Sequence, residues 1–137
     1  MRFYFIFTVA TATVLLLADA FVIPFLMRPL FQSALGDTML SELRLLPAAL
    51  FYIIHIAGII WFAGKPAKLG ASSSLTIVNG AILGFVAYSC YEMTSWTIMH
   101  DWHVGLVIAD VAWGTAISGL SALAGAFAAS GGVRNNH

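Results

Sequence analysis

Three carboxylates lie inside long apolar stretches of this chain: Asp19, Glu92 and Asp110. A charged side chain at the centre of a bilayer costs roughly 2.5–3.5 kcal/mol on insertion scales, so such groups need partners. Buried acids of this kind can carry a proton, bind a cation, hold a polar ligand or fasten helices together by hydrogen bonds. Whether these three side chains lie close together depends on the helices that carry them and on their positions along those helices.

The composition identifies the solvent of the chain as lipid. Of its 137 residues, 61% are hydrophobic and 9% charged, with a mean hydropathy of +0.93, whereas about 25% of the residues of soluble domains are charged. Six basic and six acidic side chains give a net charge of zero. The sequence has no basic field or groove-reading motif, so nucleic acid is excluded as a partner. Cys90 is the single cysteine, and no intrachain disulfide can form.

Four apolar segments are long enough to cross a bilayer, which takes about 20 residues per helix. Short connections join them, and strand-like alternation is absent. The sequence therefore predicts one integral membrane domain over residues 1–137. We expect an all-α membrane protein with four transmembrane helices in an antiparallel up-down bundle, spanning about residues 3–27, 45–63, 75–99 and 104–129.

The first segment has an alternative interpretation as a signal peptide. Arg2, the apolar run and Ala18-Asp19-Ala20 together resemble a cleavable leader. The apolar run continues through Phe21-Val22-Ile23, however, and an acid inside the cleavage motif is unfavourable. We therefore expect this segment to stay as the first span.

Basic residues in the connections predict the orientation. An even number of spans places both termini on one side of the membrane. That side collects four basic residues against two, and the side with more is expected to be cytoplasmic. The sequence thus predicts a multi-pass protein of the bacterial inner (cytoplasmic) membrane with both termini in the cytoplasm; the four are Arg2, Lys65, Lys68 and Arg134, and the two are Arg28 and Arg44.

Helix alternation places the three acids at one depth. Asp19 lies near the outer end of the first span, Glu92 near that of the third, and Asp110 near the outer start of the fourth. At 1.5 Å per residue, all three fall roughly 9–12 Å below the outer boundary. The outer connections supply polar residues above this layer, which we treat as a candidate mouth: Arg28, Arg44, His100, Asp101 and His103.

Three acids in one layer cannot all be ionised without a neutralising group. Either at least one is protonated and donates a hydrogen bond, or Arg, His, a metal ion or water neutralises the group. Helical spacing puts further polar side chains beside the acids, at i+3, i+4 and i+7. The candidate polar intramembrane cluster comprises Asp19, Tyr88, Tyr91, Glu92, Thr94, Ser95, Asp110 and Trp113.

Small residues indicate where helices pack. Gly80 and Gly84 form a GxxxG pair in the third span, and small side chains repeat every four residues in the fourth span. Such stripes permit close helix approach in lipid. The fourth span is expected to be central, with Asp110 on its buried side and a stripe made of Gly114, Ser118, Ala122 and Ala126.

Other polar and aromatic residues have structural interpretations. His55, alone among apolar neighbours, is expected to be a packing residue. His100 and His103 lie in a connection and lack the helical HExxH spacing of zinc proteases, so no metal site is predicted. Trp61, Trp96 and Trp102 are interpreted as anchors at the membrane interface.

The chain resembles an uncharacterised bacterial membrane-protein family, catalogued as domain of unknown function 2177. The likeness rests on the acid of Leu17-Ala18-Asp19, on FQSALGDTML (31–40), on LPAALFYIIHIAG (46–58), and above all on AYSCYEMTSW (87–96) with IADVAWG (108–114). The chain departs from the family pattern at Glu92, where aspartate is usual, at Val22, where tryptophan is usual, and at His55, where tyrosine is frequent. The resemblance implies a polytopic inner-membrane protein without an assigned activity.

Three classes of function fit these observations. The favoured one is a non-enzymatic membrane component that binds membrane lipids, or a partner membrane protein, and carries a buried carboxylate layer. The second is a proton- or cation-linked carrier acting as a homo-oligomer. The third is a membrane-embedded lipid-modifying enzyme with Glu92 or Asp110 as general acid/base and His100 or His103 near the mouth. That enzyme would lack an evident nucleophile, and the sequence identifies neither catalytic residues nor a cofactor.

Overall fold

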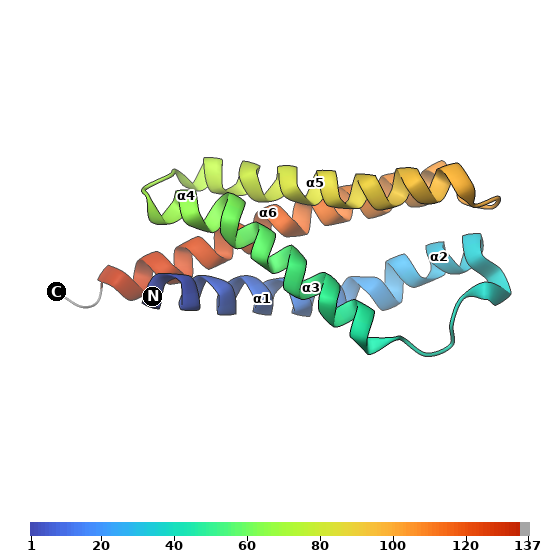
Figure 1. Ribbon diagram of the computed structural model, residues 1–137, viewed down its shortest axis with the longest axis horizontal. Helices are drawn as coiled ribbons and strands as arrows, with labels where there is room; N and C mark the ends of the chain where they lie inside the picture. Colours follow the sequence, from blue (N-terminus) through green and yellow to red (C-terminus); the bar gives the residue numbers. More distant parts are fainter. Residues whose placement is uncertain (135–137) are drawn as a thin grey trace.

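The computed structural model describes residues 1–134, with side chains to residue 131. Throughout that part of the chain the regular structure is helical, without strands. Four helical stretches are long and apolar enough to cross a membrane, and Figure 1 shows them as an antiparallel up-down arrangement. The prediction of an all-α, four-helix membrane protein is confirmed. The spans are Arg2–Thr38, Leu45–Lys68, Ser73–Ile98 and Val104–Gly131.

The first span continues well past its expected end at Met27. Helix α1 (Arg2–Val22) passes through a π-helical turn, η1 (Ile23–Met27), into α2 (Arg28–Leu35) and a short 3-10 turn, η2 (Gly36–Thr38). Proline normally breaks a helix because it lacks an N–H and its ring clashes with the carbonyl four positions back. Here the residue before Pro29 donates its N–H to Ile23, five positions back. This wider turn lets the helix continue through Pro29.

The second span follows the same rule. Helix α3 (Leu45–Ile59) enters a π-helical turn, η3 (Ile60–Gly64), and continues into α4 (Lys65–Lys68). The Lys65 N–H donates to the Ile60 carbonyl, again five positions back and directly before a proline, Pro66. The turn then falls at Gly70, whose φ of 94° suits a residue without a side chain. The second span was predicted to end at about residue 63, but the helix continues to Lys68.

Helix α2 covers the end of the bundle. The first span has 37 residues and measures about 55 Å at 1.5 Å per residue, well beyond a hydrocarbon thickness of about 30 Å. Its extra length is the amphipathic α2. The apolar side of α2, including Leu30 and Phe31, packs against a buried cluster of Trp102, Leu106 and Val107. These residues lie at or just after the turn that joins the last two helices, so protein closes this end of the bundle.

The centre of the bundle is the packing of α5 (Ser73–Ile98) against α6 (Val104–Arg134). A side chain added at Gly80 would place its Cβ 2.7 Å from the Ser118 carbonyl oxygen, and one at Gly84 would collide with Gly114 and Ser118. The close approach predicted from the two small-residue stripes is confirmed. Helix α1 packs on another face of α6, where the Thr11 hydroxyl donates to the Ser121 carbonyl at 3.2 Å.

Helix α3 is attached to this core mainly through its second half. Figure 1 shows it running obliquely to the other long helices. His55, Ile59 and Ala63 are buried, whereas Leu46 in the first half is 72% exposed. The three helices α1, α5 and α6 therefore form the compact part of the bundle, and the first half of α3 lies at its edge.

Candidate functional site

Asp19 is held by donors from two other helices. Its side chain is 2% exposed. The Tyr52 hydroxyl of α3 donates to Oδ2 at 2.9 Å, and the Trp113 indole N–H of α6 donates to Oδ1 at 2.8 Å. Both oxygens therefore have hydrogen-bond partners. This carboxylate ties α1, α3 and α6 together.

Glu92 is held on one side only. The side chain is fully buried, and its Oε2 accepts the indole N–H of Trp102 at 2.8 Å. The other oxygen, Oε1, is buried without a donor. The carboxyl of Asp110, which is 6% exposed, lies within hydrogen-bonding reach of the Glu92 side chain. A hydrogen bond between two carboxyl groups requires a proton on one of them.

His55 has a defined hydrogen-bond arrangement. Its Nε2 lies 2.8 Å from the Ser118 hydroxyl. That hydroxyl donates its single hydrogen to the Gly114 carbonyl at 2.6 Å, so it accepts from the imidazole N–H. The ring thus carries hydrogen on Nε2, and Phe51 stacks on it at 5.3 Å between ring centroids. In neutral His55, Nδ1 is left as an acceptor.

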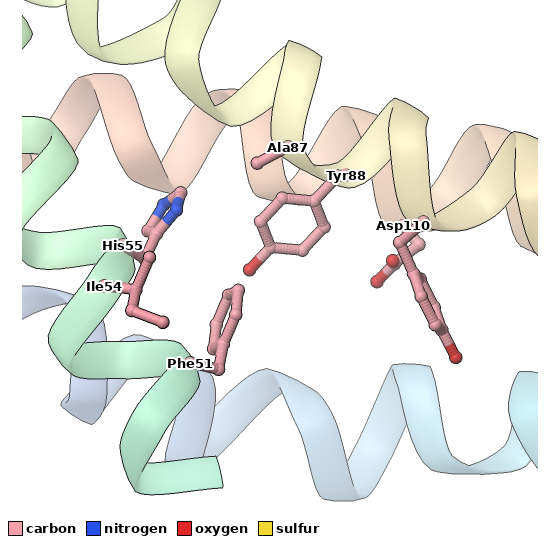
Figure 2. Close-up of a pocket in the computed structure, with 7 residues that line it drawn as sticks. Phe51, Ile54, His55, Ala87, Tyr88 and Asp110 are labelled. Atoms are coloured by element: carbon pink, nitrogen blue, oxygen red, sulfur yellow. The ribbon is translucent and has the colours of Figure 1, made fainter. Parts of the chain in front are cut away.

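A cavity of about 470 Å³ lies between α3, α5 and α6. Its wall is largely apolar or aromatic, and Figure 2 shows the Tyr88 hydroxyl and the Asp110 carboxyl on its α5–α6 side, with Phe51 and His55 opposite them. Ile54, at the rim, is 70% exposed, so the cavity opens toward the surroundings of the bundle. We call it the membrane cavity; it is lined by Phe51, Ile54, His55, Ala87, Tyr88, Tyr91 and Asp110.

A second cavity, of about 300 Å³, lies toward the α2 end of the bundle. It is bounded by the end of α1, by α2 and by the segment that precedes α3, and we call it the outer cavity. Arg28 and Ser41 contribute polar groups to it, and Asp19 lies on its wall. Tyr88 and Asp110 line both cavities. These two side chains thus stand where the two spaces meet.

The structure separates the predicted cluster into members and non-members. It brings together Asp19, Tyr88, Glu92, Asp110 and Trp113. Tyr91 is half-exposed at the cavity rim, and Ser95 is buried one turn beyond Glu92. Thr94 does not join them: it is exposed, and its hydroxyl donates to the carbonyls of its own helix at Cys90 and Tyr91. The i+2 step from Glu92 turns Thr94 to another face.

The predicted mouth residues have different surroundings. Arg28 lines the outer cavity, whereas Arg44 is exposed at the start of α3. His100 and Asp101 are exposed and pair with each other at 2.8 Å. His103 caps α6: its Nδ1 accepts the Leu106 N–H at 3.2 Å. Of this group, Arg28 is the residue that shares a cavity wall with the acids.

Two partners of the acids were missed from the sequence. Trp102 was interpreted as an interface anchor; that was wrong, because it is 3% exposed and donates to Glu92. Tyr52 was not included in the predicted polar cluster, although it precedes His55 by three residues and so lies on the same helix face. Both are tied to their acids by tertiary folding, which sequence spacing alone does not reveal.

The described residues lack a metal-binding constellation. Among residues 1–131, whose side chains the structure describes, no three His, Cys, Asp or Glu side chains are placed to hold one metal ion. The one ion pair within 4.0 Å in this part of the chain is that of His100 with Asp101. The contacts that the structure shows at Asp19 and Glu92 are hydrogen bonds from aromatic side chains.

These features define a class: a four-helix integral membrane protein with buried acids at the junction of two cavities. The particular family follows from a family-model match. The chain belongs to the family described as predicted membrane protein DUF2177, whose model matches residues 4–127. Neither a search of curated proteins nor a search of solved structures finds a match.

Proposed function

We propose that this protein is a multi-pass component of the bacterial inner membrane that binds one membrane lipid in the membrane cavity. The observation that carries the proposal is the lining of that cavity, in which the apolar Phe51 and Ile54 are exposed and the polar His55 and Asp110 are buried. A volume of about 470 Å³ lies within the range of 300–1,000 Å³ found for small-molecule sites.

The apolar wall suits a hydrocarbon chain. Phe51 and Ile54 from α3 face Ala87 from α5 across the cavity. The small side chain of Ala87 leaves room that a larger residue would fill. Contacts with such walls supply dispersion and packing energy, which drive association in a solvent that is itself apolar.

The inner end of the cavity suits the polar part of a lipid. Tyr88 offers a hydroxyl that can donate or accept, and His55 offers an imidazole acceptor. Asp110 adds a carboxyl group on the same wall. These groups match the hydroxyl and ester oxygens between a lipid headgroup and its chains.

Entry from the side would follow from the arrangement of α3. This helix makes few contacts with α1 and α5, and the rim residue Ile54 is largely exposed. A lipid could therefore enter between α3 and α5 without unfolding the bundle. With both termini in the cytoplasm, as the basic residues favour, the acid layer lies in the outer half of the bilayer.

Filling the cavity tests the proposal. In Ala87→Trp the indole occupies the lipid space, and the matched control Ala49→Trp adds the same indole at an exposed position of α3. Native mass spectrometry would count lipids retained from nanodiscs of phosphatidylethanolamine and phosphatidylglycerol. We expect retention to fall about tenfold in Ala87→Trp, which corresponds to a loss of about 1.4 kcal/mol, and to stay unchanged in the control. Equal retention in both variants, at equal thermal stability, would disprove lipid binding in this cavity.

A further inference from the structure

The buried Oε1 atom of Glu92 is a hydrogen-bond acceptor without a donor. Glu92 is 0% exposed, and its other oxygen already accepts the Trp102 N–H. A buried carboxylate oxygen left bare bears the full cost of desolvation. Some group must therefore supply a hydrogen to this atom.

The neighbouring carboxyl of Asp110 is placed to supply that hydrogen. It comes from α6, is only 6% exposed, and lies within hydrogen-bonding reach of the Glu92 side chain. Two ionised carboxylates within hydrogen-bonding reach repel each other. One proton shared by the pair removes a negative charge and forms a hydrogen bond. The same proton resolves both difficulties.

We propose that Glu92 and Asp110 form a proton-binding site, in which the Asp110 O–H donates to Glu92 Oε1 while Trp102 holds Glu92 Oε2. The ligand of the site is one proton taken from water. The pair faces both cavities through Asp110, so the proton can exchange without separation of α5 and α6. This site does not depend on the proposed lipid.

None of the described charged groups around Glu92 and Asp110 forms an ion pair with them, so a proton is left to neutralise one of the two carboxylates. Asp19 of α1 already has a hydrogen-bond donor for each of its oxygens. His55 of α3 donates to Ser118, away from the acids. Arg28 reaches the outer cavity but forms no ion pair within 4.0 Å among the described residues. The remaining titratable groups near the pair are the phenols Tyr52, Tyr88 and Tyr91, which are neutral at pH 7.

Infrared spectroscopy detects such a proton directly. The C=O stretch of a protonated carboxylic acid is separate from the bands of a carboxylate, and it can be recorded at pH 7 on the full chain in nanodiscs. We expect the wild-type protein to show this band. Glu92→Gln and Asp110→Asn should each abolish it entirely, because either amide donates an N–H to the acid that remains and lets that acid ionise.

Asp19→Asn is the matched control. It also replaces a buried acid by an amide, but Asp19 has its own donors, so the band should persist in full. Glu92→Asp keeps a carboxyl at the position and should retain the band at a shifted frequency. Absence of the band in wild-type protein at pH 7 would overturn the proposal, as would its survival in both amide variants. Loss of the band only in Asp19→Asn would assign the proton to Asp19 instead.

Discussion

Two acid sites in the same bundle differ in their donors. At Asp19, each oxygen accepts a hydrogen bond from a different helix. At the Glu92–Asp110 pair, Trp102 serves one oxygen and another buried oxygen has no donor. The side chains are chemically alike and similarly buried, so the number of donors decides their roles. Asp19 fits the role of a fastener between helices, and the pair fits that of a proton site.

The largest expected effect is the loss of the fastener. Asp19→Leu keeps the volume roughly but leaves the partly buried Tyr52 hydroxyl and Trp113 N–H without an acceptor. Interhelical hydrogen bonds in membranes average about 0.6 kcal/mol, and orphaned buried donors cost about 1–3 kcal/mol each. We expect a loss of about 2–4 kcal/mol in unfolding free energy, measured in mixed micelles with increasing denaturing detergent.

Asp19→Asn is the control for that measurement. Its amide oxygen can accept from Trp113 while its N–H donates to the Tyr52 hydroxyl, which is free to rotate. It should lose less than half as much unfolding free energy as Asp19→Leu. Equal losses in the two variants would show that the charge of Asp19, and not its hydrogen bonding, holds the helices.

A smaller effect is expected from a matched pair of tryptophan substitutions. Trp102→Phe removes the donor of Glu92, whereas Trp113→Phe leaves Asp19 with its second donor, Tyr52. Both changes remove the same atoms. We expect Trp102→Phe to cost about 1–2 kcal/mol more, because an acceptor left bare is costlier than one that keeps a partner. The contrast between the two sites is wrong if Trp113→Phe costs as much as Trp102→Phe.

The difference between the sites lies partly beyond what a sequence reveals. The common depth of the acids follows from the alternation of helices, and the packing of α5 on α6 follows from Gly80 and Gly84. Two of the three donors do not follow, because Tyr52 is 33 positions from Asp19 and Trp102 is 10 from Glu92. Which face of a peripheral helix turns inward depends on tertiary packing that periodicity leaves open.

The extent of the helices was the other failure of sequence reasoning. The first two spans were predicted to end at about residues 27 and 63, shortly before Pro29 and Pro66, and proline normally breaks a helix. Each is instead accommodated by a π-helical turn. This local adjustment matters for the site, since it allows α2 to continue and bury Trp102, the donor of Glu92.

A still smaller effect is expected when one of the two donors of Asp19 is removed. Tyr52→Phe deletes a single hydroxyl from a half-buried ring and leaves the Trp113 N–H in place. The loss should be about 0.5–1 kcal/mol of unfolding free energy in the same micelle assay, close to the average for one interhelical hydrogen bond in a membrane protein. A loss above about 2 kcal/mol would mean that Asp19 depends on the phenol far more than on the indole.

The smallest expected effect falls on the pair, where substitution by an amide should leave stability almost unchanged. In Asp110→Asn the new N–H donates to Glu92 Oε1, which otherwise depends on a proton. The unfolding free energy should stay within about 0.5 kcal/mol of wild type or rise, since a fixed donor replaces a shared one. Asp110→Leu is the comparison, because it fills the position without a donor and leaves Oε1 bare. It should therefore be the less stable of the two variants in the same micelle assay. If the asparagine and leucine variants are equally stable, Glu92 draws its hydrogen from elsewhere, and the distinction between the two acid sites fails.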